Sequence, residues 1–135
     1  MKLQVGVKIL LKNSDNKYLL LKRSAEKYGK TSGSWDIVGG RIDPGSNLLE
    51  NLKREVMEET QLEITSEPKL LFAQDIIPND EKHVVRLTYV GETIGEPVLD
   101  TSENIEYLWL TIDEMKTHED LDTYVQEILD KGLLL

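Results

Sequence analysis

The chain has 135 residues, 25 of them acidic and 16 basic, and this formal net charge of -9 disfavours a nucleic-acid polymer as partner. It contains no cysteine, which excludes disulfides, thiolate nucleophiles and cysteine-ligated metal centres. No apolar run approaches the ~20 residues of a membrane span and the start lacks a signal peptide's apolar core, so we expect a cytoplasmic protein away from membranes.

The first part of the chain predicts two strands. Apolar side chains alternate from Leu3 to Leu11 and share one face, which indicates a half-buried strand. A polar turn at 13–16 and an apolar run at 17–23 predict a second strand, paired with the first as a hairpin. Residues 24–34 are small and polar, which predicts a surface loop.

A helix is predicted over 47–60. Asn47 and Glu50 have the spacing of a capping box at its start. Its leucines and valine cover an arc of about 100°, which is typical of a helix that packs one face on a core.

The second half predicts strands at 69–77, 83–90 and 106–110, and then a helix that opens near Thr117 and Asp120 and ends at Gly132. No linker or repeat interrupts these elements. We therefore expect one α/β (α+β) domain over residues 1–135, with a mixed sheet covered by helices.

Three glutamates carry the chemical signal. Glu55, Glu58 and Glu59 have i, i+3 and i+4 spacing, so they share one helix face near its C-terminal end. Their mutual repulsion and the helix dipole both disfavour this placement, so a bound cation would explain it. Because all candidate ligands are oxygens, that cation would be Mg²⁺ or Mn²⁺. A solvated helix face is the alternative, and the preceding Gly39-Gly40 turn favours the metal.

The stretch 40–62 resembles the signature of the Nudix hydrolase family, G-x5-E-x7-R-E-U-x-E-E-x-G-U, where U is a bulky aliphatic residue. Seven of the nine defined positions match: Gly40, Arg54, Glu55, Val56, Glu58, Glu59 and Leu62. Within the family, the chain resembles small pyrophosphohydrolases of the MutT type. It implies an α/β/α sandwich with a central mixed sheet.

The same resemblance implies roles for individual residues. The metal ligands would be the Gly39 carbonyl, Glu58 and Glu59, while Glu55 would bind metal or act as general base. Arg54 would orient the glutamates. A later acid would complete the metal site. Glu103 is the first candidate, and Glu106 and Asp100 are the alternatives.

Arg23 matches a position that holds a substrate phosphate in the family, and Gly40 and Arg41 are further candidates for substrate binding. The implied reaction is Mg²⁺-dependent hydrolysis of a nucleoside triphosphate to a monophosphate and pyrophosphate. ADP-ribose, another nucleotide sugar and a dinucleoside polyphosphate are the alternative small-molecule substrates. The protein would act as a monomer or homodimer.

Two positions depart from the family signature. Ser46 replaces a glutamate that supports the site, so we expect attenuation unless Asp43 or Glu50 takes its place. This departure motivates a second hypothesis, a catalytically weak domain that senses nucleotides. Gln61 replaces a glycine just past the helix, where a left-handed backbone costs about 1 kcal/mol.

Overall fold

The computed structural model describes residues 1–29 and 34–135. The strands are β1 (Lys2–Lys12), β2 (Tyr18–Arg23), β3 (Trp35–Asp36), β4 (Val38–Arg41), β5 (Lys69–Asn79), β6 (Lys82–Glu92) and β7 (Asn104–Leu110). The helices are α1 (Ala25–Tyr28), α2 (Leu48–Thr60), α3 (Ile112–Lys116) and α4 (Thr123–Asp130). Residues 30–33 of the predicted loop lie outside the described residues.

β1 is the central strand of a mixed sheet. It pairs in parallel with β6 along its whole length, from Lys2 opposite Lys82 to Lys12 opposite Glu92. Its other edge pairs antiparallel with β4 and then, at Lys12 alone, with Tyr18 of β2. The predicted hairpin of β1 and β2 is therefore reduced to one residue pair, because β4 occupies most of that edge. β2 in turn pairs with β3 and β7, and β5 with β6.

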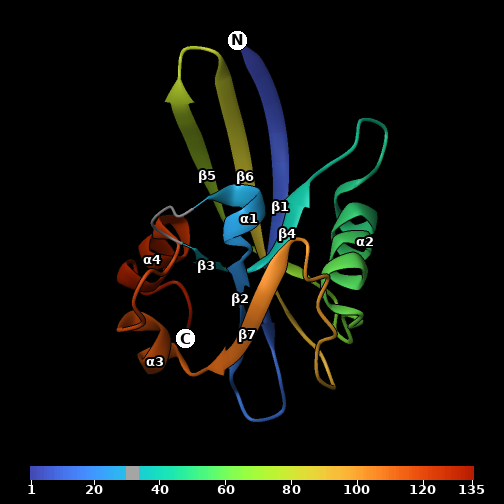
Figure 1. The fold of residues 1–135 in the computed structure, drawn as a ribbon, viewed down its shortest axis with the longest axis vertical. Coiled ribbons are helices and arrows are strands. Elements are labelled where there is room, and N and C mark those ends of the chain that lie inside the picture. Colours follow the sequence, from blue (N-terminus) through green and yellow to red (C-terminus); the bar gives the residue numbers. More distant parts are fainter. Residues whose placement is uncertain (30–33) are drawn as a thin grey trace.

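Helices cover both faces of this sheet, as Figure 1 shows, with α2 on one side and α3 and α4 on the other. One apolar cluster joins Val7 and Ile9 of β1 to Leu52 of α2. A second cluster joins Leu10 to Ile128 of α4. The α/β/α arrangement with a mixed sheet is thus confirmed.

The expectation that β1 buries a single face is wrong in two places. Leu10 is fully buried on the opposite face, because the C-terminal half of β1 lies inside the sandwich. Leu3 is 65% exposed, because the start of β1 projects beyond the helices together with the β5–β6 hairpin (Figure 1). We call this part of the sheet the projecting ribbon, residues 2–6, 75–79 and 82–86.

α2 follows its sequence signals closely. The Asn47 side chain accepts a hydrogen bond from the Glu50 amide at 2.9 Å, which caps the first turn. Leu52 and Val56 are fully buried. The helix ends at Gln61, whose φ of 57° is left-handed, as the departure from the family glycine predicted.

The predicted start of the last helix is wrong. Thr117 instead ends α3, which opens with a capping box of Thr111 and Glu114. α4 begins six residues later, where the Asp122 carboxylate accepts hydrogen bonds from the amides of Tyr124 and Val125. In the part of the chain that the structure describes, no helix is both long and apolar enough to cross a membrane.

Replacing Gln61 with glycine should stabilise the fold. The left-handed backbone of Gln61 is strained for a residue with a side chain, and its own side chain is exposed, so little contact is lost. We expect Gln61→Gly to raise the free energy of unfolding by about 0.5–1 kcal/mol in urea titrations. Gln61→Ala is the control and should bring no gain. Equal stability of the glycine and alanine variants would contradict this explanation.

Candidate functional site

The Gly39-Gly40 turn of β4 brings the backbone against both β1 and α2. Gly39 has a φ of 143°, and a Cβ atom there would lie 2.1 Å from the Val7 carbonyl oxygen. A Cβ atom on Gly40 would lie 2.8 Å from Oε2 of Glu55. Only glycine therefore fits at position 39, and a side chain at position 40 would displace the Glu55 carboxylate, which lies directly over the turn.

Glu59 and Glu55 are the two more enclosed glutamates of α2. Oε2 of Glu59 accepts a hydrogen bond from the Gly39 amide at 2.9 Å, and Oε1 accepts one from the Asn104 side chain at 3.5 Å. Burial is the main cause that raises the pKa of Glu59, to about 7. Burial also raises the pKa of Glu55, against the nearby charge of Arg54. Both carboxylates thus lose hydration that a cation would replace.

Arg54 organises the more exposed side of the cluster. Its guanidinium donates to Glu58 at 2.9 Å and lies 3.3 Å from Oε1 of Glu55. It also donates to Asp43 at 3.1 Å and to Asn51 at 3.0 Å. Of the two acids expected to take the place of the missing family glutamate, Asp43 therefore contacts Arg54.

Asn51 is a site residue that the sequence reasoning missed. It is fully buried on α2, and its side chain accepts from the Asp43 amide at 3.1 Å and donates to the Arg41 carbonyl at 3.3 Å. It therefore fastens the segment after β4 to the helix that carries the glutamates. The signal available in the sequence was a polar residue, Asn51, next to the apolar positions that face the core.

The acids form what we call the carboxylate pocket, a cavity of about 360 Å³. Its acidic lining residues are Glu55, Glu58, Glu59, Asp100 and Glu103, and Tyr28, Gly39, Gly40 and Arg41 complete it. Two of the three candidate late acids, Glu103 and Asp100, thus reach the pocket. Glu106 lies beside Lys22 in the β2–β7 pairing and lines neither this pocket nor its neighbour.

Glu103 is held by α1, the short helix inside the predicted loop. Its carboxylate accepts hydrogen bonds from the Lys27 ammonium and the Tyr28 hydroxyl. These hydrogen bonds, the one from Lys27 first, lower the pKa of Glu103. Glu103 is therefore an ionised carboxylate at the rim of the pocket.

The chemistry of this lining fits a hard divalent cation, because its side-chain donors are carboxylate oxygens and it contains no histidine. Among residues 1–29 and 34–135, no group of three acidic or histidine side chains is drawn together tightly enough to hold an ion. Glu58, Glu59 and Glu103 each accept a hydrogen bond from a donor of the protein.

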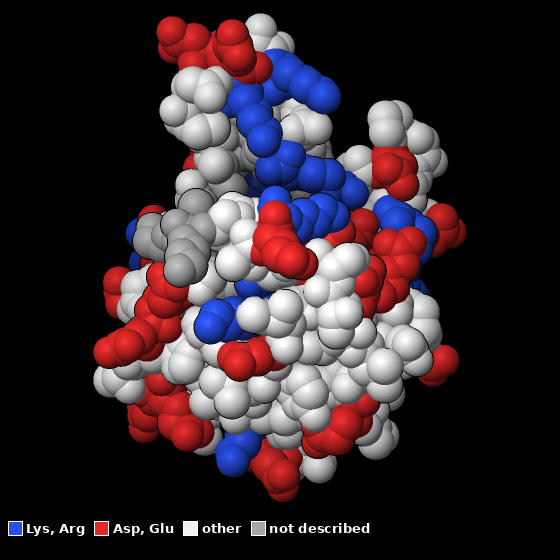
Figure 2. Space-filling model, viewed as in Figure 1, with Lys and Arg blue, Asp and Glu red and all other residues white. Residues whose placement is uncertain are grey.

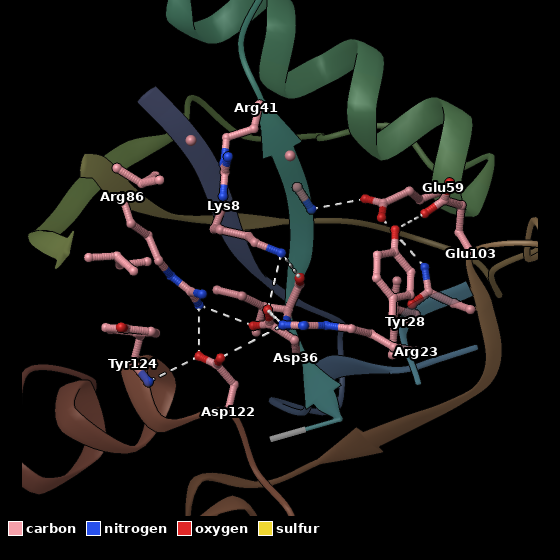
Figure 3. A pocket seen from close by; sticks show the side chains of 18 residues that line it. Lys8, Arg23, Tyr28, Asp36, Arg41, Glu59, Arg86, Glu103, Asp122 and Tyr124 are labelled. Atoms are coloured by element: carbon pink, nitrogen blue, oxygen red, sulfur yellow. Dashed lines mark hydrogen bonds and ion pairs between the residues drawn. The ribbon is translucent and has the colours of Figure 1, made fainter. Parts of the chain in front are cut away.

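A second cavity, of about 370 Å³, adjoins the first and shares Tyr28, Gly39, Gly40, Arg41, Glu59 and Glu103 with it. We call it the cationic pocket after Lys8, Arg23, Arg41 and Arg86, which line it together with the acids Asp36, Glu59, Glu103 and Asp122. Figure 3 shows Lys8, Arg23 and Arg86 converging on Asp36 from three directions. The predicted substrate residues Arg23, Gly40 and Arg41 all lie here.

Asp36 is the centre of this charge network. Its buried carboxylate lies 2.9 Å from Nη2 of Arg23, 3.1 Å from Nη2 of Arg86 and 3.2 Å from Nζ of Lys8. Burial alone would raise its pKa, but the three cations outweigh burial and hold the pKa of Asp36 well below its usual range. Asp122, the cap of α4, lies 3.1 Å from Arg86 and ties the helix to the same network.

Lys8, Asp36, Arg86 and Asp122 were not predicted. They come from β1, β3, β6 and the start of α4, so no short sequence spacing unites them. The sequence signal for Lys8 was that it belongs to the polar face of the alternating strand β1. For Arg86 it was a charged side chain within an otherwise apolar strand.

The comparisons with known proteins agree with this geometry. The NUDIX domain model matches residues 2–130 of the chain. The nucleoside triphosphatase NudI of Escherichia coli O17:K52:H18 (strain UMN026 / ExPEC) is 30% identical over 131 residues, covering 90% of this chain and 92% of that protein. NudI of Escherichia coli strain K12 has the same identity and coverage.

Solved structures share the fold over nearly the whole chain. The crystal structure of a MutT protein from Methanosarcina mazei Go1 has a TM-score of 0.80 and 26% identity, covering 96% of this chain and 91% of that one. A MutT NUDIX hydrolase from Burkholderia pseudomallei has a TM-score of 0.78 and 21% identity, covering 99% and 100%.

The chain belongs to the Nudix hydrolase family. It is accordingly a pyrophosphohydrolase, an enzyme that acts on phosphorus-containing anhydrides.

Removing the carboxylate of Asp36 should destabilise the fold in a pH-dependent way. Asp36→Asn leaves three cations without their common partner, so we expect a loss of about 3–5 kcal/mol in the free energy of unfolding at pH 7. Because the folded pKa of Asp36 is lowered, its contribution is complete above the unfolded pKa of about 3.9 and declines as the pH falls below it. Urea titrations should show a difference about 1 kcal/mol smaller at pH 3 than at pH 7. A difference that stays constant over this range would contradict the assignment.

Proposed function

We propose that the enzyme hydrolyses a nucleoside triphosphate to a nucleoside monophosphate and pyrophosphate, with Mg²⁺ as its metal and Mn²⁺ as a substitute. The observation that carries this proposal is the junction of an acidic cavity with a cavity that four basic side chains line, which share Gly39, Gly40, Arg41, Glu59 and Glu103. A molecule with several phosphates and a nucleoside would use both. The similarity to nucleoside triphosphatase NudI supports this substrate class over a nucleotide sugar.

The metal would be held by the Gly39 carbonyl and by Glu55, Glu58, Glu59 and Glu103, as the family resemblance implies. When bound, it would neutralise phosphate oxygens and lower the pKa of the attacking water. The enclosed glutamates are poor at binding a polyanion by themselves, since their charges have the same sign. The acidic pocket therefore needs a cation to accept this substrate.

The side chains of the protein supply the remaining functions. Glu55, placed over the glycine turn, takes the proton of the water that attacks phosphorus. Arg54 fixes Glu55 and Glu58 through its hydrogen bonds. Arg23, half-exposed at the wall of the cationic pocket, stabilises the charge on a phosphate as the anhydride bond breaks.

The contacts of Arg54 weigh against the hypothesis of an inactive sensor domain. That hypothesis arose because Ser46 removes a carboxylate from the family signature. Asp43 and Asn51 now supply Arg54 with two oxygen partners from the segment around that position. We therefore propose that Ser46 leaves the enzyme active.

The first test is turnover of a panel of nucleoside triphosphates, ADP-ribose and nucleotide sugars with Mg²⁺ or Mn²⁺, measured as release of pyrophosphate or phosphate. We expect nucleoside triphosphates to be the preferred class, and Glu58→Gln to lower kcat/KM by about 10²-fold or more. The matched control is Glu50→Gln, on the same helix but outside both cavities, which should change kcat/KM less than about twofold.

A wild-type protein that binds a nucleotide but releases no product from any member of the panel would overturn the proposal in favour of the sensor. Preference for ADP-ribose or a nucleotide sugar would overturn the substrate class alone. Titration calorimetry with Mn²⁺ separates the metal site from the substrate. Mn²⁺ should bind the wild type and should bind the triple Gln variant of Glu55, Glu58 and Glu59 far more weakly.

The second test concerns Asp43 as the replacement for the family glutamate. Asp43→Ala should lower kcat about 10–100-fold, because Arg54 loses a partner that positions it. Ser46→Glu should change the wild-type rate little, and it should rescue the Asp43→Ala variant. Rescue is the readout that a purely structural effect of Asp43 would not give. A strong gain from Ser46→Glu in the wild type, with no effect of Asp43→Ala, would contradict this role.

A further inference from the structure

The short helix α1 lies on the surface beside the site. It is a single turn of four residues, and all four are exposed to solvent. Figure 2 shows acidic and basic side chains next to each other at the surface where α1 lies in Figure 1. The apolar core therefore does not hold α1, and its place on the molecule depends on contacts made at the surface.

The polar contacts of α1 converge on Glu103. The Lys27 ammonium donates to Oε1 of Glu103 and the Tyr28 hydroxyl donates to Oε2, so each carboxylate oxygen accepts a hydrogen bond from α1. The amide of Ser24, the residue before α1, donates to the Glu103 carbonyl oxygen at 2.8 Å. Glu103 is thus at once the anchor of α1 and a carboxylate at the rim of the carboxylate pocket.

Tyr28 stands where the two pockets meet. It lines both the carboxylate pocket and the cationic pocket, and Figure 3 shows its ring directed toward Glu59 and Glu103. Cζ of Arg23 lies 5.9 Å from the centre of this ring, within the range of a cation–π contact. A movement of α1 would therefore change the wall that the two pockets share.

Lys27 competes with a cation for Glu103. An ammonium group and a divalent cation have charges of the same sign, so they repel each other when they share one carboxylate. The ion pair is also open to solvent, since 50% of the Lys27 side chain and 27% of the Glu103 side chain are exposed, and such pairs stabilise little. A cation that other carboxylates of the pocket also bind would displace Lys27.

We propose that Lys27 and Tyr28 are positioning residues that hold Glu103 on α1 in the metal-free enzyme, and that cation binding takes Glu103 from Lys27 and releases α1 at the junction of the two pockets. The inference rests on the metal of the proposed function. Because such coupling is reciprocal, a change that loosens α1 should tighten cation binding.

The first readout is the affinity for Mn²⁺, measured by titration calorimetry without a nucleotide. Lys27→Met/Tyr28→Phe removes both donors and nearly keeps the size of the side chains. It should lower Kd about three- to tenfold, because the cation no longer breaks these contacts. In the Glu103→Gln background the same two changes should alter Kd less than about twofold, because the carboxylate in contention is gone.

Lys53→Met is the matched control for charge. Lys53 is exposed on α2, the helix that carries the glutamates, and lies outside both pockets. Its loss should change Kd less than about twofold at physiological ionic strength, where exposed charges are screened. An equal effect of Lys53→Met and Lys27→Met/Tyr28→Phe, or a gain that persists in the Glu103→Gln background, would overturn the proposal.

The second readout is the mobility of α1. The chain has no cysteine, so Glu26→Cys, at an exposed position of α1, provides a single site for a nitroxide label. Saturating Mg²⁺ should increase the mobile component of the electron paramagnetic resonance spectrum. In Lys27→Met/Tyr28→Phe the label should be mobile with and without Mg²⁺. A label at Lys116→Cys, on α3, should not respond to Mg²⁺.

The remaining outcomes separate this proposal from the proposed function. Mn²⁺ binding by the wild type with an unchanged spectrum of the label on α1 would overturn the release of α1 and leave the metal site intact. Weaker Mn²⁺ binding by Lys27→Met/Tyr28→Phe would also overturn it, because the two donors would then present Glu103 to the metal. Absence of Mn²⁺ binding by the wild type would overturn both the proposed metal and this inference.

Discussion

The whole site depends on one constraint: α2 holds carboxylates of like charge against a turn of two glycines. The Glu55 carboxylate lies over Gly40, where a side chain would displace it, and the Gly39 amide donates to Glu59. The packing of Leu52 and Val56 on β1 sets how deeply the glutamates are enclosed. The apolar core thus determines the electrostatics of the site, because it brings like charges into a poorly hydrated place.

The rest of the molecule gathers basic side chains next to this point. Asp36 collects Lys8, Arg23 and Arg86 on the other side of the glycine turn, and this arrangement requires β1, β2, β3 and β6 to meet there. The parallel pairing of β1 and β6 supplies two of the three cations. The net charge of -9 therefore hides a difference between the two pockets: five acids line the first, whereas four basic and four acidic side chains line the second.

The sequence predicted those parts of the site whose residues lie within a few helical turns. Glu55, Glu58 and Glu59 share one face through local geometry alone, and the glycine pair is close to them in the chain. The network around Asp36 could not be predicted in this way, because its members are separated by up to 114 positions, from Lys8 to Asp122, and are brought together by strand pairing. Local signals also misplaced the start of α4. Thr117 and Asp120 have the spacing of a capping box, but the residue that caps the helix is Asp122.

The most direct test of this account is a crystal soaked with Mn²⁺ and a nucleotide analogue that resists hydrolysis, examined by anomalous diffraction. The account predicts an anomalous peak in the carboxylate pocket, with oxygen ligands from Glu55, Glu58 or Glu59 at about 2.0–2.4 Å, and phosphates between the metal and Arg23. A peak elsewhere on the acidic surface, or a nucleotide bound in this cleft with no metal beside the glutamates, would contradict it.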